Sequence, residues 1–108
     1  MSDSIILFYV TLPHTESGTQ IAKKLLEDKL IACANILPSH TSVYEWDGKI
    51  VEENEHVMIL KTRAELAQKV EEVVSTMYPY DTPCILQINT EGVNSPFSEW
   101  INQQTSVN

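Results

Sequence analysis

The chain has 108 residues, a formal net charge of −8 and a hydrophobic fraction of 43%. This length predicts a single domain over residues 1–108, because a second hydrophobic core would leave too few residues for either half. The acidic balance argues against a nucleic-acid partner, since phosphate binding needs clustered Lys and Arg. It argues equally against adsorption to an anionic membrane.

The N-terminal segment and the two cysteines predict a cytoplasmic protein. Residues 1–16 lack the basic start and the long apolar stretch of a signal peptide. The apolar run over residues 5–10 is too short to cross a membrane. Cys33 and Cys84 lie in apolar surroundings without a CxxC partner, so we expect both to be buried, reduced thiols.

Hydrophobic periodicity and turn residues predict the order of helices and strands. The expected elements are a strand over 4–12, a helix over 15–30, a strand over 31–37 that resumes over 41–46, a strand over 49–62, a helix over 64–78, a strand over 84–90 and a short helix over 94–105. Thr15 or Ser17 is expected to cap the first helix, and Ser95 the last. The inward residues of the two long helices are expected to be Ile21, Leu25, Leu26 and Leu30, then Leu66, Val70, Val73 and Val74, with Met77 close to the second stripe.

This β-α-β-β-α-β order with a C-terminal helix predicts an α+β, ferredoxin-like fold, with an antiparallel sheet covered by two helices on one face. The fold by itself does not indicate a function, because it supports many.

The Asp47-Gly48 dipeptide predicts a hairpin, since a type I′ turn needs positive φ at both central positions. In that register Trp46 faces Lys49, and Tyr44 faces Val51. The two aromatic residues then share one side of a protruding hairpin. Exposed aromatic side chains usually mark an interface, so the pattern favours assembly over ligand stacking.

Glu52, Glu53, Glu55 and His56 suggest a divalent-cation site, because carboxylate and imidazole groups are suitable ligands. Neighbouring residues of a strand point to opposite faces, so Glu53 and Glu55 share one side while Glu52 and His56 share the other. A dense ligand set would therefore need a second chain. The alternative is a solvated acidic strand that discourages edge-to-edge aggregation.

Other candidate groups are sparse. His14, His40 and His56 lack metal-binding spacing, and no Walker loop or Ser-His-Asp set occurs. A small enzyme using His56 or Tyr80 as the acid–base group is a further alternative. Lys61, at the end of an apolar strand, can bind an anion or a carboxylate of another chain.

Three segments occur in order: KLLEDKLIACANILP, SVYEWDGKIVEENEHVMILKT and YPYDTPCIL. They resemble the CutA family, the divalent-cation tolerance proteins, over nearly the whole chain. The most specific matches are Tyr44, Trp46, Gly48 and Lys49, the Lys61-Thr62 pair, and Pro79, Tyr80 and Pro83.

The resemblance implies a non-enzymatic homotrimer built like the PII signalling proteins, in which hairpin strands pair between subunits. It implies a role in divalent-metal tolerance or in small-ligand sensing. On this resemblance, the inter-subunit clefts are lined by Tyr44, Trp46, Lys49, Lys61 and Tyr80.

The family is also linked to copper, with a proposed Cys ligand in the first strand and His ligands before the P-Y loop. Val10, Met77 and Tyr78 stand at the matching positions, so those ligands are absent. Glu53, Glu55 and His56 remain the candidates for a copper or other divalent-cation site.

Overall fold

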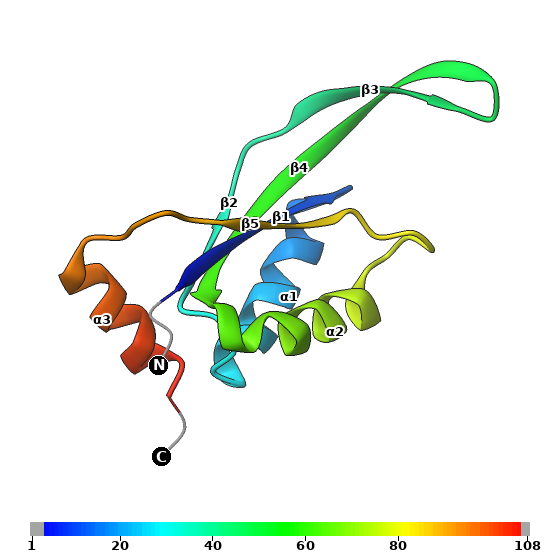
Figure 1. Cartoon of the computed structure of the whole chain (residues 1–108). Coiled ribbons are helices and arrows are strands. Elements are labelled where there is room, and N and C mark those ends of the chain that lie inside the picture. Colours follow the sequence, from blue (N-terminus) through cyan, green and yellow to red (C-terminus); the bar gives the residue numbers. More distant parts are fainter. Residues whose placement is uncertain (1–3, 107–108) are drawn as a thin grey trace.

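A sheet with two helices on one face and a third helix beside its end forms the molecule (Figure 1). The computed structural model describes residues 4–106. The elements are β1 (Ile5–Leu12), α1 (Thr15–Glu27), β2 (Cys33–Ile36), β3 (His40–Trp46), β4 (Lys49–Arg63), a 3-10 turn (Ala64–Leu66), α2 (Ala67–Met77), β5 (Ile85–Asn89) and α3 (Ser95–Gln104). None of the helices in this part of the chain is long and apolar enough to span a membrane.

The strand order is β2-β4-β1-β5, and β3 continues beside β4 where β2 ends. All four strand pairings are antiparallel. This order confirms the predicted ferredoxin-like arrangement.

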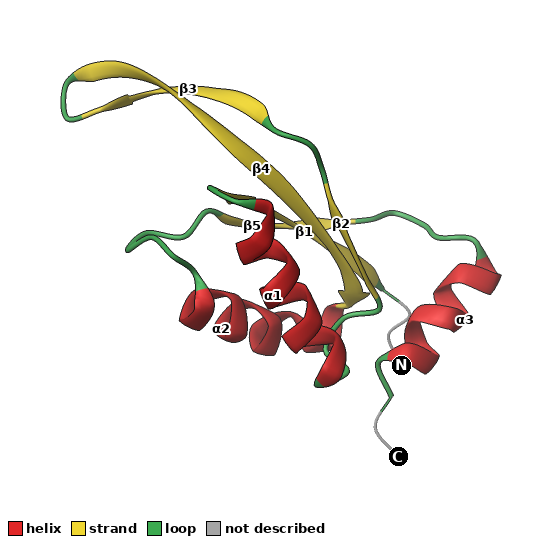
Figure 2. Cartoon of the chain, turned by 180° about the vertical axis from the view of Figure 1, so that it is seen from behind, coloured by secondary structure: helices red, strands yellow, loops and turns green. Residues whose placement is uncertain are grey.

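Strand β4 is longer than its partners and divides into two halves. From His56 to Arg63 it pairs with β1, and part of this half also pairs with β2. From Lys49 to Glu55 it pairs with β3, beyond the end of β1. The β3–β4 hairpin therefore projects far from the sheet (Figures 1 and 2), and the longest dimension of the molecule is 48 Å.

The hairpin turn has the predicted backbone. Asp47 and Gly48 have φ values of 54° and 79°, the positive pair that a type I′ turn requires. Trp46 lies opposite Lys49, and Tyr44 opposite Val51, so the predicted register is confirmed.

The main core lies between the sheet and the two helices α1 and α2. It contains Ile6, Phe8, Val10 and Leu12 of β1, Met58 and Leu60 of β4, Ile21 and Leu25 of α1, and Val70 and Val74 of α2. One predicted inward residue is wrong: Leu26 is 43% exposed. Met77, expected close to the inward stripe of α2, is 38% exposed. Leu26 follows buried Leu25 by one residue, which turns its side chain about 100° away from the core.

Helix α1 ends earlier than predicted because Lys29 adopts a left-handed conformation, with φ of 58°. The amide of Leu30 donates to the carbonyl of Leu25 at 2.9 Å, and the amide of Lys29 donates to the carbonyl of Leu26 at 3.1 Å. These are the two bonds of a Schellman motif, which usually has glycine at this position. The predicted caps are also wrong: His14 and Asn94 are the N-cap residues of α1 and α3.

Candidate assembly and ligand surface

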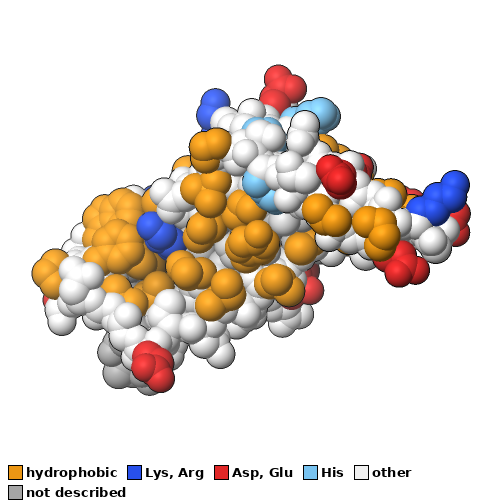
Figure 3. Space-filling model, turned by 90° about the horizontal axis from the view of Figure 1, so that it is seen from above, with side chains coloured by type: hydrophobic (Ala, Val, Ile, Leu, Met, Phe, Trp, Pro, Cys, Tyr) orange, Lys and Arg blue, Asp and Glu red, His pale blue; other side chains and the backbone are white. Residues whose placement is uncertain are grey.

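The sheet face opposite α1 and α2 carries hydrophobic side chains that the chain itself leaves largely uncovered. Leu86 and Ile88 of β5 are 55% and 43% exposed, and they lie opposite half-buried Tyr9 and Leu7 of β1. Figure 3 shows hydrophobic side chains gathered over this face. We call it the open face. Within a single chain, helices α1 and α2 therefore cover only the other face of the sheet.

Helix α3 covers one end of the open face. Ile101 is fully buried against Ile5 and Ala32, and Phe97 packs on the same cluster. The rings of Phe97 and Trp100 stack with their centroids 5.6 Å apart. At this end Arg63 donates to Thr105 twice, from Nε to Oγ1 at 2.8 Å and from Nη2 to the carbonyl oxygen at 3.1 Å.

The hairpin tip is the most exposed apolar region of the described chain. Trp46 is 69% exposed and shares one side of the hairpin with Tyr44, which is 38% exposed. Val43 and Ile50, on the other side, are 63% and 71% exposed. Apolar groups on both sides of a projecting hairpin indicate a surface that another chain covers.

Tyr80 belongs to the loop between α2 and β5, close enough to the hairpin for the charges of Glu53 and Glu55 to act on it. The hydroxyl of Tyr78 donates to the carbonyl of Thr11, which holds this loop at the end of β1. The rings of Tyr78 and Tyr80 pack edge to face at 5.8 Å. Partial burial raises the pKa of Tyr80 above its usual 10.0, and the negative charges of Glu53 and Glu55 add to the shift.

The acidic side chains of the predicted carboxylate–histidine segment lie on both sides of β4, as strand alternation predicts. Glu53 pairs with Ser42 and Glu55 with His40, on the side opposite Glu52. His56 has its Nδ1 3.2 Å from the carbonyl oxygen of Leu37. Among residues 4–106, no three His, Cys, Asp or Glu side chains come together as a metal site.

The two cysteines lie at opposite edges of the sheet. Cys33 belongs to β2, and Cys84 directly precedes β5, so the strand order keeps the two thiols apart. Both are free and half-buried rather than buried as predicted.

The positions that the resemblance links to copper do not fit a copper ion. Val10 is fully buried in the core, where it has no group that can bind a metal. The hydroxyl of Tyr78 is used by Thr11. A single Met77 thioether does not make a copper site.

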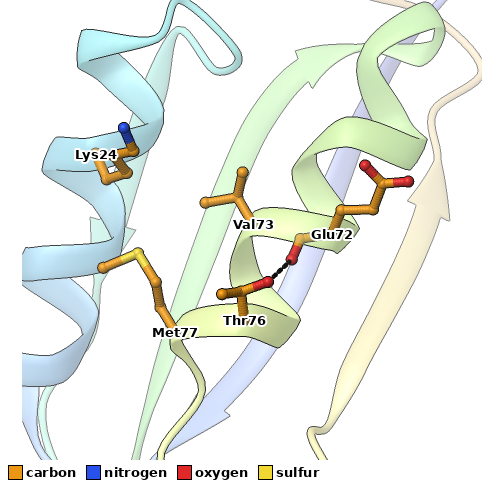
Figure 4. Close-up of a pocket in the computed structure, with 5 residues that line it drawn as sticks. All are labelled: Lys24, Glu72, Val73, Thr76 and Met77. Atoms are coloured by element: carbon orange, nitrogen blue, oxygen red, sulfur yellow. Dashed lines mark hydrogen bonds between the residues drawn. The ribbon is translucent and has the colours of Figure 1, made fainter.

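Sequence reasoning missed a shallow depression between α1 and α2 (Figure 4). It is lined by Lys24 of α1 and by Glu72, Val73, Thr76 and Met77 of α2. Thr76 Oγ1 donates to the backbone carbonyl of Glu72 at 2.9 Å, so this hydroxyl is already used. Helical spacing alone places Glu72, Val73, Thr76 and Met77 on neighbouring positions, but not beside Lys24.

The five predicted cleft residues do not form one site within a single chain. Lys49 and Lys61 are separated by roughly 40 Å along β4, at about 3.3 Å per residue. Trp46 and Tyr44 lie with Lys49 near the tip, Tyr80 lies beside the middle of the hairpin, and Lys61 lies on the open face.

The fold and these surfaces define a ferredoxin-like domain with a projecting acidic hairpin and an apolar sheet face. A family model described as CutA1 divalent ion tolerance protein matches residues 6–104. The chain therefore belongs to the CutA1 family of divalent ion tolerance proteins, and the resemblance found in the sequence is confirmed.

Individual relatives agree with this assignment. The divalent-cation tolerance protein CutA of Pyrococcus horikoshii is 41% identical over 101 residues, which cover 94% of this chain and 98% of the relative. The chloroplastic protein CutA of Arabidopsis thaliana is 37% identical over 93% of this chain, but the match spans only 55% of that longer protein.

Solved structures are similar over nearly their whole length. CutA1 from Ehrlichia chaffeensis superposes with a TM-score of 0.93 at 42% identity, covering 95% of this chain and 96% of the other. A structure from Archaeoglobus fulgidus, described as a periplasmic divalent cation tolerance protein, has a TM-score of 0.90 at 40% identity and covers 94% and 99% of the two chains.

Proposed function

We propose that this protein acts as a non-enzymatic homotrimer in the response to divalent cations. The observation that carries this proposal is the exposed apolar surface of the hairpin and the open face, with Trp46 and Ile50 at 69% and 71% exposure. Such a surface is costly in a monomer and is stabilising once a second copy covers it.

The hairpin supports closed assembly in a second way. The half of β4 from Lys49 to Glu55 lies past the end of β1, which leaves a strand edge available there for pairing. Natural proteins cover or blunt such edges, and a closed symmetric oligomer removes them. The choice of three subunits follows the resemblance to the family and to PII proteins.

We infer that a small ligand or a cation binds in clefts between subunits. Tyr44, Trp46, Lys49, Lys61 and Tyr80 are too far apart to meet in one chain, so a shared cleft needs groups from two chains. The relatives named divalent-cation tolerance proteins support a connection to divalent ions. Copper is the first ion to test, because the resemblance links the family to it.

A second candidate is a divalent-cation site built from Glu53, Glu55 and His56 together with groups of another chain. The strand register favours it, since it places Glu53 and Glu55 on one side of the hairpin. Calorimetric titration separates the two cases: a built site saturates at a fixed number of ions per chain, whereas attraction to an acidic surface is weak and screened by salt.

We further propose a cytoplasmic location, supported by the free thiols of Cys33 and Cys84. Relatives are named for other compartments, chloroplastic in Arabidopsis and periplasmic in Archaeoglobus. Cell fractionation of the native protein tests this location.

The deciding experiment is the mass in solution by light scattering, with and without copper. We expect one species of three chains at both conditions. A monomer overturns the proposal, and a trimer that forms only with copper makes the carboxylate–histidine segment its centre.

A further inference from the structure

Lys61 differs from every other lysine of the chain in its surroundings. Lys23, Lys24, Lys29, Lys49 and Lys69 are exposed, whereas Lys61 is half-buried on the open face. Its strand neighbours are Leu7 in β1 and Cys33 in β2, directly opposite on either side. Figure 3 shows how strongly hydrophobic side chains dominate this face.

No carboxylate reaches Lys61 within residues 4–106, although the chain carries 15 acidic residues. Its Nζ lies 5.6 Å from the centre of the Phe97 ring, a cation–π contact. Arg63, two residues further along the same side of β4, is held by two hydrogen bonds to Thr105. Thr105, at the end of α3, thus accepts hydrogen bonds from Arg63, whereas Phe97, near the start of α3, provides Lys61 only with an aromatic ring.

This arrangement becomes costly when the open face is covered. Covering the face removes water from the ammonium group, and a desolvated charge is tolerated only when it is paired. The open face and Lys61 therefore place a requirement on whatever packs there: it must bring a negatively charged group.

We propose that Lys61 is the receptor for a carboxylate of a second copy's hairpin. This inference rests on the proposed trimer. The hairpin suits the role because it projects beyond its own sheet (Figure 1) and carries acidic residues, Glu45, Asp47, Glu52, Glu53 and Glu55. Strand alternation puts Glu53 and Glu55 on the same side of β4 as Lys49, which lies opposite Trp46. Glu52 lies on the other side.

The test follows trimer dissociation on dilution, by light scattering, for the full chain. Lys61→Met keeps an unbranched apolar side chain but removes the charge. We expect it to weaken each interface on the order of 30-fold or more, because the partner's carboxylate is left desolvated and unpaired. Lys61→Arg is expected to stay trimeric. Lys69→Met makes the same charge change on exposed α2 and is expected to behave as the wild type.

Charge exchange identifies the partner and guards against a variant that simply folds poorly. Lys61→Glu combined with Glu53→Lys or Glu55→Lys is expected to restore the trimer. Lys61→Glu with Glu52→Lys, which has the same net charge, is expected to remain dissociated.

The outcomes separate this inference from the proposed function. A wild-type trimer that Lys61→Met leaves unchanged overturns the pairing but not the trimer. Equal rescue by all three charge exchanges overturns it as well, since net charge would then explain the effect. A wild-type monomer at every concentration overturns both.

Discussion

Replacing Trp46 with Ala tests the assembly surface most directly. The side chain is 69% exposed in the single chain, and it has no aromatic or hydrogen-bonded partner among residues 4–106. In a monomer, removing so exposed a side chain changes the free energy of unfolding by less than about 0.5 kcal/mol. In a trimer, the same change removes apolar area from an interface.

The expected size of the effect follows from the exposed area. A Trp side chain presents up to about 250 Å², so an exposed fraction of 69% leaves roughly 170 Å², equivalent to about 4 kcal/mol at about 25 cal/mol per Å² if a neighbour covers it fully. Coverage of half this area corresponds to about 2 kcal/mol, and its loss raises the dissociation constant about 30-fold.

The assay is the dependence of mass on concentration, together with the melting temperature. Leu26→Ala is the matched control, because Leu26 is a 43% exposed apolar residue on α1, away from the open face and the hairpin. We expect Trp46→Ala to dissociate at higher concentration than the control. Identical mass curves and melting temperatures for Trp46→Ala, Leu26→Ala and the wild type would refute the assembly role of the hairpin tip.

Three further outcomes test local features of the fold. Gly48→Ala should lower the free energy of unfolding by about 1–2 kcal/mol, because a residue with an L side chain is strained at φ of 79°. Its melting temperature should be lower than that of the control Gly92→Ala, where a Cβ meets open space and no positive φ is required. Thr62→Val should cost about 1–3 kcal/mol in denaturant unfolding, since the buried Thr62 hydroxyl donates to the Leu30 carbonyl at 2.6 Å; a neutral result would show that this carbonyl has another partner. Tyr80 should ionise above pH 10.0, as measured by the difference between the ultraviolet titrations of the wild type and Tyr80→Phe. Its contribution to stability is fully present below that pH and should decline as the pH rises further. A difference curve centred at pH 10.0 contradicts the raised pKa.

Local signals in the sequence were sufficient for the strands and for the hairpin register. The Asp47-Gly48 turn allows one register, and alternation then decides which side chains share a side. The end of α1 was missed because Lys29 takes the left-handed position that glycine usually marks. Lysine rarely adopts the left-handed conformation, so its presence at this position does not indicate a helix end.

The candidate surface was predictable only in part, because its members come together through contacts distant in sequence. Tyr80 approaches Glu53 and Glu55 because the Tyr78 hydroxyl fixes its loop to Thr11, 67 residues earlier in the chain. The half-burial of Lys61 depends on α3, which folds back to place Phe97 beside it. Neither contact follows from local spacing.

In the proposed trimer, the division of β4 would link ligand binding to assembly. Its first half carries Lys49 beside Trp46 at the exposed tip, and its second half carries Lys61 on the open face. A ligand that contacts both the hairpin tip and the open face must bridge two subunits, so it would bind the proposed trimer and not the free chain. Each bound ligand then stabilises the trimer by mass action, and by reciprocity any change that strengthens the trimer raises the affinity for that ligand. A Trp46→Ala or Lys61→Met variant should therefore lose ligand affinity and trimer stability together.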